Sequence, residues 1–133
     1  MDSRAVNVAG DCSFDVRMVQ VDDLESQPAL CVGVAEKADG SGRALVFQLA
    51  HEFDDQDRAL GMDTYAISTD TGATIYGGVT HYVLTDRLLS IWFSDNASTK
   101  LGIGRECQLA LSVDPESLAK LRDGLRRILG NRD

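Results

Sequence analysis

The sequence of 133 residues contains no long run of apolar side chains. A helix that crosses a bilayer needs about 20 consecutive, mostly apolar residues, and no segment of the chain approaches that length. Residues 1–8 also lack the basic start and the apolar core of a secretory signal. We therefore expect a cytoplasmic protein that makes no contact with a membrane.

The cysteines lack the spacing of a metal site. Cys12, Cys31 and Cys107 are odd in number, lie far apart and form no CxxC pair, so their pattern does not indicate zinc. We expect reduced thiols, with Cys31 and Cys107 as small buried residues of strands.

Motifs of enzymes and of nucleotide-binding proteins are missing as well. The chain has neither GxGxxG nor GxxxxGK[ST], and His51-Glu52 is not part of an HExxH helix. His81 lies among strand residues, where a half-buried structural histidine is the ordinary interpretation and a catalytic base is the alternative. We predict no catalytic residue, no metal and no cofactor.

Basic residues are scarce in most of the chain. Residues 1–119 contain 19 acidic and 8 basic side chains, a net charge of −11, whereas residues 120–133 have a net charge of +3. Affinity for nucleic acid comes largely from Lys and Arg that displace counterions, so this balance argues against a nucleic-acid partner. A basic protein partner is the natural complement.

What the chain does contain is a series of strand patterns separated by turns. Alternating or apolar segments are "FDVRMVQV", "ALCVGVAE", "RALVFQLAH", "TYAIST", "ATIYGGV", "THYVLT", "LLSIWFS" and "ECQLALSV". Turn sequences such as "KADGSG" and Asp86-Arg87 separate neighbouring members, which predicts antiparallel hairpins. A meander is the simplest arrangement of such strands.

Two helices are predicted near the carboxyl end. The segment "SDNASTKLG" has Ser94 or Asp95 as an N-cap and Gly102 as a stop, which suits one or two turns. The segment "DPESLAKLRDGLRRILG" has Asp114 as cap and Gly130 as terminator. Its apolar stripe is Leu118, Leu121, Leu125, Ile128 and Leu129. Its basic side chains suit the end of a helix dipole, and a nucleic-acid or membrane role is the alternative.

These patterns predict a single α+β domain over residues 1–133. We expect a twisted, mainly antiparallel β-sheet with a short helix and a C-terminal amphipathic helix packed on it.

One segment, "HEFDDQDRALGMDTY" at residues 51–65, is strongly acidic. Its carboxylates are Glu52, Asp54, Asp55, Asp57 and Asp63. An EF-hand loop needs an oxygen ligand at its fifth position and glycine at its sixth, but counting from Asp55 these positions are Ala59 and Leu60. A surface for a basic partner, a solvated loop and a divalent site completed elsewhere in the fold remain as interpretations.

The chain resembles the immunity protein 10 family of bacterial polymorphic toxin systems over about residues 29–130. The resemblance lies in "GSGRALVFQLAHEFDDQDRALGMDTYAISTDTGATIYGGVTHYVL", in "LLSIWF" and in the short helix "DNASTKLG". Its most specific parts are Phe53–Asp57, Gly61–Tyr65 and Tyr76–Val79. The resemblance implies a protein that is no enzyme and that binds and blocks a cognate toxin domain.

Under this interpretation the acidic segment meets a basic toxin. Complementary charge speeds encounter and selects the partner, so we predict contacts from Glu52, Asp54, Asp55, Asp57 and Asp63. Tyr76, Gly77 and Gly78 are added as predicted contacts, although a glycine pair inside a strand more often marks a bulge or bend. The alternative is a small enzyme or ligand-binding domain that uses the acidic segment and His81.

Overall fold

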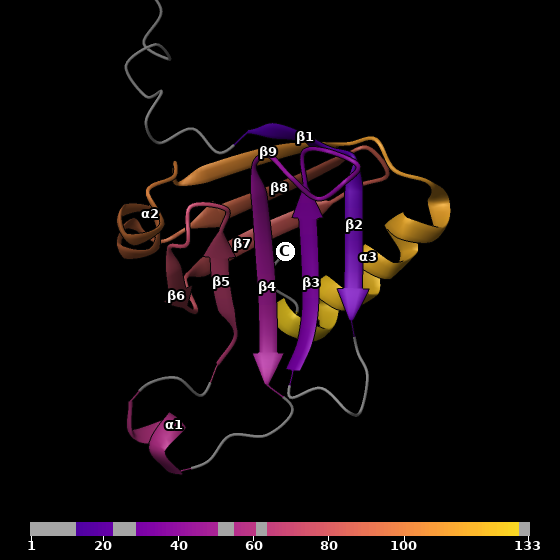
Figure 1. Cartoon of the computed structure of the whole chain (residues 1–133). Helices are drawn as coiled ribbons and strands as arrows, with labels where there is room; N and C mark the ends of the chain where they lie inside the picture. Colours follow the sequence, from indigo (N-terminus) through magenta and orange to yellow (C-terminus); the bar gives the residue numbers. More distant parts are fainter. Residues whose placement is uncertain (1–12, 23–28, 51–54, 61–63, 131–133) are drawn as a thin grey trace, which may run out of the picture.

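The structure is a computed structural model that describes residues 13–22, 29–50, 55–60 and 64–130 (Figure 1). Within them the strands form two sheets. Sheet A contains, in spatial order, β1 (Phe14–Val16), β9 (Glu106–Leu111), β8 (Leu88–Phe93) and β7 (Val79–Leu84). Sheet B contains β2 (Met18–Asp22), β3 (Ala29–Ala35), β4 (Ala44–Ala50), β5 (Ala66–Thr69) and β6 (Thr74–Tyr76). The helices are α1 (Asp55–Ala59), α2 (Asp95–Leu101) and α3 (Pro115–Leu129). The predicted α+β class is confirmed.

Sheet B is the meander that the sequence predicts. β3 and β4 pair in antiparallel register from Ala29–Ala50 to Ala35–Ala44, which confirms the hairpin expected around "KADGSG". Val32 and Phe47 are fully buried partners in this ladder, whereas Gln48 on the opposite face is exposed. The period of two in the sequence therefore separates a core face from a solvent face.

The segment predicted as one strand, "FDVRMVQV", is split between the two sheets at Arg17. The Val16 carbonyl accepts a hydrogen bond from the Ser112 N–H at 2.8 Å, beside the parallel pair β1–β9. The Arg17 N–H donates to the Ala35 carbonyl at 3.0 Å, which begins the pairing of β2 with β3. Adjacent residues thus satisfy their backbone groups in different sheets, and β1–β9 is a parallel pair in an otherwise antiparallel fold.

The core lies between the sheets, whose strands cross at a steep angle in Figure 1. Alternate residues from both sheets meet in one buried cluster. Its fully buried members include Val32, Phe47 and Ile67 from sheet B and Leu89, Ile91 and Leu109 from sheet A.

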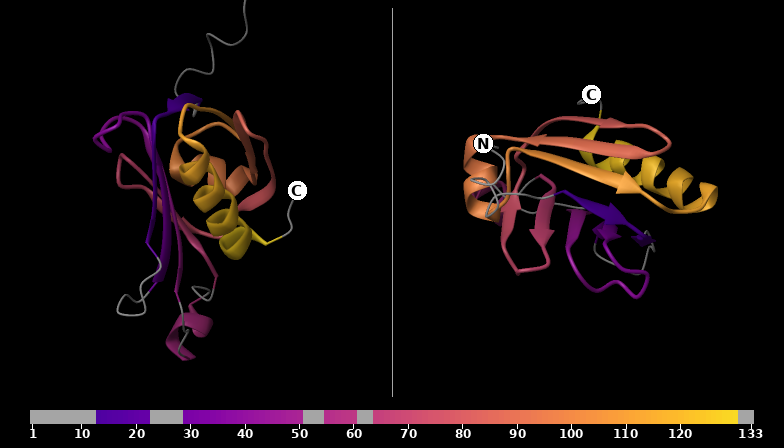
Figure 2. Two further views of the ribbon diagram at one scale, coloured as in Figure 1. Left: turned by 90° about the vertical axis from the view of Figure 1, so that its right-hand side faces the viewer. Right: turned by 90° about the horizontal axis from the view of Figure 1, so that it is seen from above.

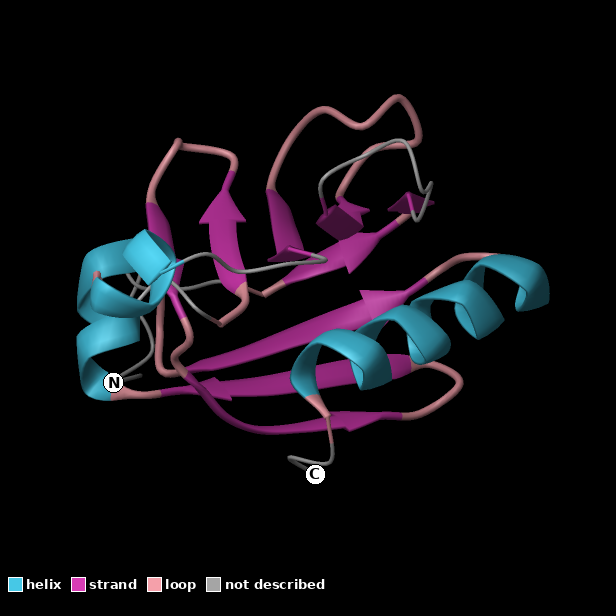
Figure 3. Cartoon of the chain, turned by 90° about the horizontal axis from the view of Figure 1, so that it is seen from below, coloured by secondary structure: helices cyan, strands magenta, loops and turns pink. Residues whose placement is uncertain are grey.

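Two helices close opposite sides of this sandwich (Figures 2 and 3). α2 contacts β6 and β8, and α3 packs on β2, β3 and β4. Leu121, Leu125 and Leu129 are fully buried as predicted, whereas Leu118, the first residue of the predicted stripe, is only half-buried. The Tyr82 hydroxyl of β7 donates to the Gly130 carbonyl at 3.1 Å, so the end of α3 is also tied to sheet A.

The predicted helix boundaries are confirmed. Ser94 accepts a hydrogen bond from the Ala97 N–H at 3.2 Å, and Gly102 ends α2 in the left-handed conformation with φ 71°. Asp114 caps α3 by accepting from the Ser117 N–H at 3.1 Å. Hydrogen bonds from Ser117 hold the pKa of Asp114 below its ordinary value.

The cysteines differ from expectation in two respects, the disulfide of Cys107 and the incomplete burial of Cys31. Cys107 is fully buried in β9, as predicted, but it is disulfide-bonded. The prediction of reduced thiols is therefore wrong for Cys107; its partner lies outside the described residues. Cys31 is a half-buried free thiol on β3. Among the described residues, no helix is both long enough and apolar enough to cross a membrane.

Candidate functional site: the acidic end of sheet B

The acidic segment forms the connection from β4 to β5. Its described part includes α1, where Asp55 is fully exposed and pairs with Arg58 of the same helix at 3.3 Å. Asp57 also lies in α1, whereas Glu52, Asp54 and Asp63 lie outside the described residues. An ion pair between two such exposed side chains contributes little to stability. The carboxylate of Asp55 therefore contributes little to the stability of the fold.

Tyr76 lies at the same end of sheet B. It is the last residue of β6 and is paired with Ala66, the first residue of β5. Ala66 in turn pairs with Gln48 near the end of β4, so the connection that carries α1 leaves the sheet beside Tyr76 (Figure 1). The Tyr76 side chain is 46% exposed, a large fraction for an aromatic residue. We call this set, residues 51–65 together with Tyr76, the acidic end.

Gly77 and Gly78 carry the chain from sheet B to sheet A. Both have positive φ, 74° and 104°, which L side chains rarely adopt. A Cβ on Gly78 would lie 2.6 Å from the Ala97 Cβ of α2 and 2.7 Å from the Ile75 Cδ1. The crossing itself therefore requires glycine at this point, as the interpretation of a bend predicts. Contact of Gly77 and Gly78 with a partner stays a prediction.

Tyr65 holds the crossing in place from within the core. Its hydroxyl accepts a hydrogen bond from the Val79 N–H at 3.0 Å, and its carbonyl accepts from the Gly77 N–H at 2.8 Å. Tyr65 is 3% exposed. It ends the acidic segment, so one side chain fixes the end of this segment to the start of β7.

His81 of β7 lies opposite Trp92 of β8. Its ring packs against Trp92 with centroids 4.7 Å apart, and the side chain is half-buried on β7. The part of the chain that the structure describes holds no group of three or more His, Cys, Asp or Glu side chains placed to bind a metal ion.

A cavity of about 370 Å³ lies at the other end of β4, away from the acidic end. Its lining residues are Phe14, Arg43, Ala44, Leu45, Thr69, Asp70, Thr71, Leu101, Gly102 and Ile103. Neither His81 nor Asp55 is among them, so this cavity is not the site of the alternative enzyme or ligand-binding interpretation. The sequence offered no signal for this cavity, because its lining comes from widely separated segments.

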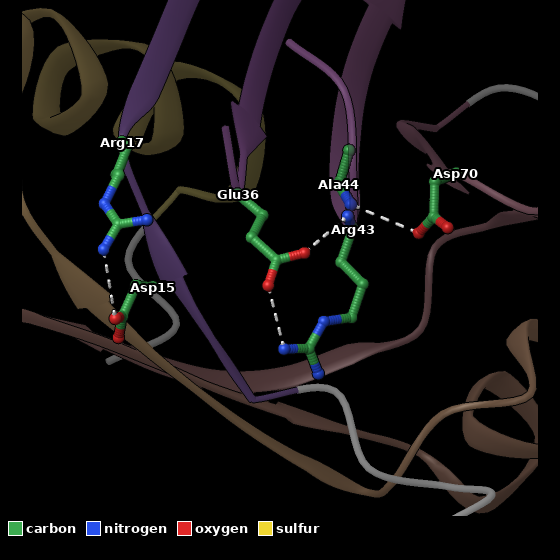
Figure 4. Close-up of polar contacts among 6 residues, drawn as sticks. All are labelled: Asp15, Arg17, Glu36, Arg43, Ala44 and Asp70. Atoms are coloured by element: carbon green, nitrogen blue, oxygen red, sulfur yellow. Dashed lines mark hydrogen bonds and ion pairs between the residues drawn. The ribbon is translucent and has the colours of Figure 1, made fainter. Parts of the chain in front are cut away.

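Charged groups beside the cavity are already paired (Figure 4). Arg43 donates to the Glu36 carboxylate at 3.2 Å and lies over the Phe14 ring, 5.5 Å from its centroid. Hydrogen bonds from Arg43 hold the pKa of Glu36 below its ordinary value. Asp70 accepts from the Ala44 N–H at 3.2 Å. These contacts tie the β3–β4 turn, the β5–β6 turn and β1 together, which is a structural role.

Comparison with known protein families shows the family to which the chain belongs. The family model for immunity protein 10, Imm10, matches residues 15–119, which run from β1 into α3 and include the whole acidic end. The chain belongs to the Imm10 family. The match begins earlier than the resemblance noted from residue 29 and takes in β1 and β2. No curated protein and no solved structure matches the chain.

Membership of Imm10 identifies the chain as an immunity protein and implies a toxin as its partner. It also favours a protein that acts by binding over one that acts as an enzyme.

Proposed function

We propose that this Imm10 protein neutralises a cognate toxin domain of a bacterial polymorphic toxin system by stoichiometric protein–protein binding. The observation that carries the proposal is the Imm10 match over residues 15–119. We place the encounter in the cytoplasm of the toxin-producing cell. Thiol labelling in intact cells tests this location. A Cys107 disulfide that persists in the cells is typical of an oxidising compartment and would count against the cytoplasm.

We further propose that the acidic end is the surface that meets the toxin. Full exposure of the Asp55 carboxylate and the half-exposed Tyr76 at the same end of sheet B support this role. The net charge of −8 favours a basic toxin domain. In this arrangement the carboxylates at residues 52–63 attract the partner, and Tyr76 supplies apolar contact area at the sheet end.

Charge reversal at the acidic end tests this surface. In the triple variant Asp54→Lys, Asp55→Lys and Asp57→Lys, we expect nearly unchanged thermal stability, because an exposed ion pair such as Asp55–Arg58 adds little to it. The association rate with the purified toxin domain should fall about tenfold or more at low salt, and its salt dependence should be lost or reversed. Stopped-flow binding at several ionic strengths measures both effects.

A matched control carries the same change of net charge elsewhere. Asp86, Glu116 and Asp123 are exposed carboxylates of the β7–β8 turn and α3, and reversing all three to Lys should leave most of the association rate intact. Cells that co-express the toxin should survive with the control and die with the acidic-end variant, at equal protein abundance. Equal survival with both variants would show that the acidic segment is only a solvated loop.

A further inference from the structure

The face of sheet A that points away from the core carries an aromatic patch. Leu89 and Ile91 of β8 are fully buried, so alternation places Ser90 and Trp92 on the outward face. Trp92 is the single tryptophan of the chain and is only partly buried. The helices pack elsewhere, α3 on β2, β3 and β4, and α2 on β6 and β8 beside the crossing. Figure 2 shows this face turned away from sheet B.

Three side chains form a row across this face. His81 of β7 and Glu106 of β9 are the cross-strand partners of Trp92 on its two sides. Directly opposed residues of antiparallel strands have Cβ atoms about 5 Å apart, so the Glu106 carboxylate lies within reach of the indole edge. Gln108 donates a hydrogen bond to Glu106 Oε2, which orients the carboxylate.

The charged strand residues of this face are acidic. Alternation puts Glu106 and Asp15 on it, and both are exposed. Asp15 is paired with Arg17 at 3.9 Å, so Glu106 is the carboxylate that remains beside the indole. An indole face attracts a cation through its quadrupole, and a neighbouring carboxylate adds an ion pair. The row therefore has the chemistry of a receptor for a positively charged side chain.

We propose that Trp92 and Glu106, with the His81 ring packed at a tilt against the indole, receive an arginine or lysine side chain of the toxin. This inference rests on the proposed function and names a contact outside the acidic segment. A partly exposed tryptophan on a sheet face against which neither α2 nor α3 packs suits the centre of an interface, where tryptophan and arginine contribute most of the binding energy.

The row and the acidic end lie on different faces of the molecule. Tyr76 shares a register row with Ala66 and Gln48 on the solvent face of sheet B, whereas Trp92 lies on the outward face of sheet A. Tyr76 and His81 are five positions apart in the chain, joined through the Gly77–Gly78 crossing. The contact proposed at Trp92 is therefore a second contact, separate from the acidic end.

Fluorine labelling of Trp92 gives an NMR signal to which the unlabelled toxin does not contribute. Because Trp92 is the single tryptophan, a protein grown with 5-fluorotryptophan has one indole ¹⁹F resonance. On titration with the unlabelled toxin domain we expect this resonance to shift and to lose its response to H₂O/D₂O exchange. Toxin binding, followed in parallel by calorimetry, with an unchanged resonance would overturn the inference and leave the proposed function standing. A toxin that does not bind the wild-type chain at all would refute the proposed function itself.

Two substitutions and a control test the cationic occupant. Trp92→Ala should weaken toxin binding about thirtyfold, as for a hot-spot tryptophan, and Glu106→Gln about threefold to tenfold, chiefly through faster dissociation. Glu116→Gln removes an exposed carboxylate of α3 and should leave the Kd unchanged. If Trp92→Ala does not fold, Trp92→Phe replaces it. If the Glu106 and Glu116 variants bind equally well, no cation of the toxin is held at this row.

Discussion

At the scale of single residues, the glycines show how one residue type serves different ends. Gly78 combines φ 104° with contacts that leave no room for a Cβ. Gly72, in the β5–β6 turn, has φ 92° but no atom within 4 Å of the position of a Cβ. At Gly72 only the backbone conformation requires glycine, whereas at Gly78 both the conformation and the packing do.

This difference predicts unequal costs for the same substitution. Gly72→Ala should lower the free energy of unfolding by about 1 kcal/mol through backbone strain. Gly78→Ala should cost about 1–3 kcal/mol more, because Ala97 and Ile75 must move. Urea denaturation of both variants measures the difference. Equal losses of stability would mean that α2 can move away from a Cβ at position 78 at no cost in free energy. Close packing against α2 would then not explain the glycine at this position.

At the scale of elements, α3 shows how an amphipathic pattern becomes a packed helix. Its buried face meets β2, β3 and β4, and Gly124 brings the helix so close that a Cβ there would lie 2.5 Å from the Val32 Cγ2. Its basic residues lie on the exposed side, where Arg126 and Arg127 pair with Asp123 and Arg122 pairs with Asp86. These pairs and the helix dipole give the described basic residues of α3 a structural role.

A charge introduced into the buried face of α3 should destabilise the fold. Leu121 and Leu125 are fully buried, and replacing either with Asp should cost about 3 kcal/mol or more. Ala119→Asp adds the same charge on the exposed face of the helix and should cost less than about 1 kcal/mol. Thermal melts of the three variants test the assignment, which an unchanged melting temperature for Leu121→Asp would refute.

At the scale of the whole molecule, the two sheets and the two longer helices share one core. Tyr82 joins sheet A to the end of α3, and the crossing at Gly78 packs on α2. The buried cluster runs through all of these elements without a break. Sheet A therefore has no separate core that would let it unfold independently.

We expect the chain to unfold in a single cooperative transition. Trp92 reports on sheet A and far-UV circular dichroism reports largely on α3, so fluorescence and dichroism should give the same urea midpoint. The Leu121→Asp variant should shift both midpoints together, although Leu121 packs on sheet B. A fluorescence transition at lower urea than the loss of helix would contradict the shared core.

The sequence by itself determined the features that depend on near neighbours in the chain. Alternation marked the strands, Ser94 and Asp114 marked the helix starts, and the β3–β4 hairpin followed from its turn residues. The acidic segment was visible as composition alone, and motifs around it indicated Imm10.

Tertiary structure alone decided which strands share a sheet and which side chains meet. The sequence does not show the break at Arg17, because both halves alternate with the same period. Pairing partners determine it, and they lie 95 residues away for β1 and 9 to 17 residues away for β2. The row of His81, Trp92 and Glu106 depends on the register of three strands, and the position of Tyr76 beside the start of β5 depends on the pairing of β5 with β6. Register and pairing are set by burial of a common core, which no local segment can encode.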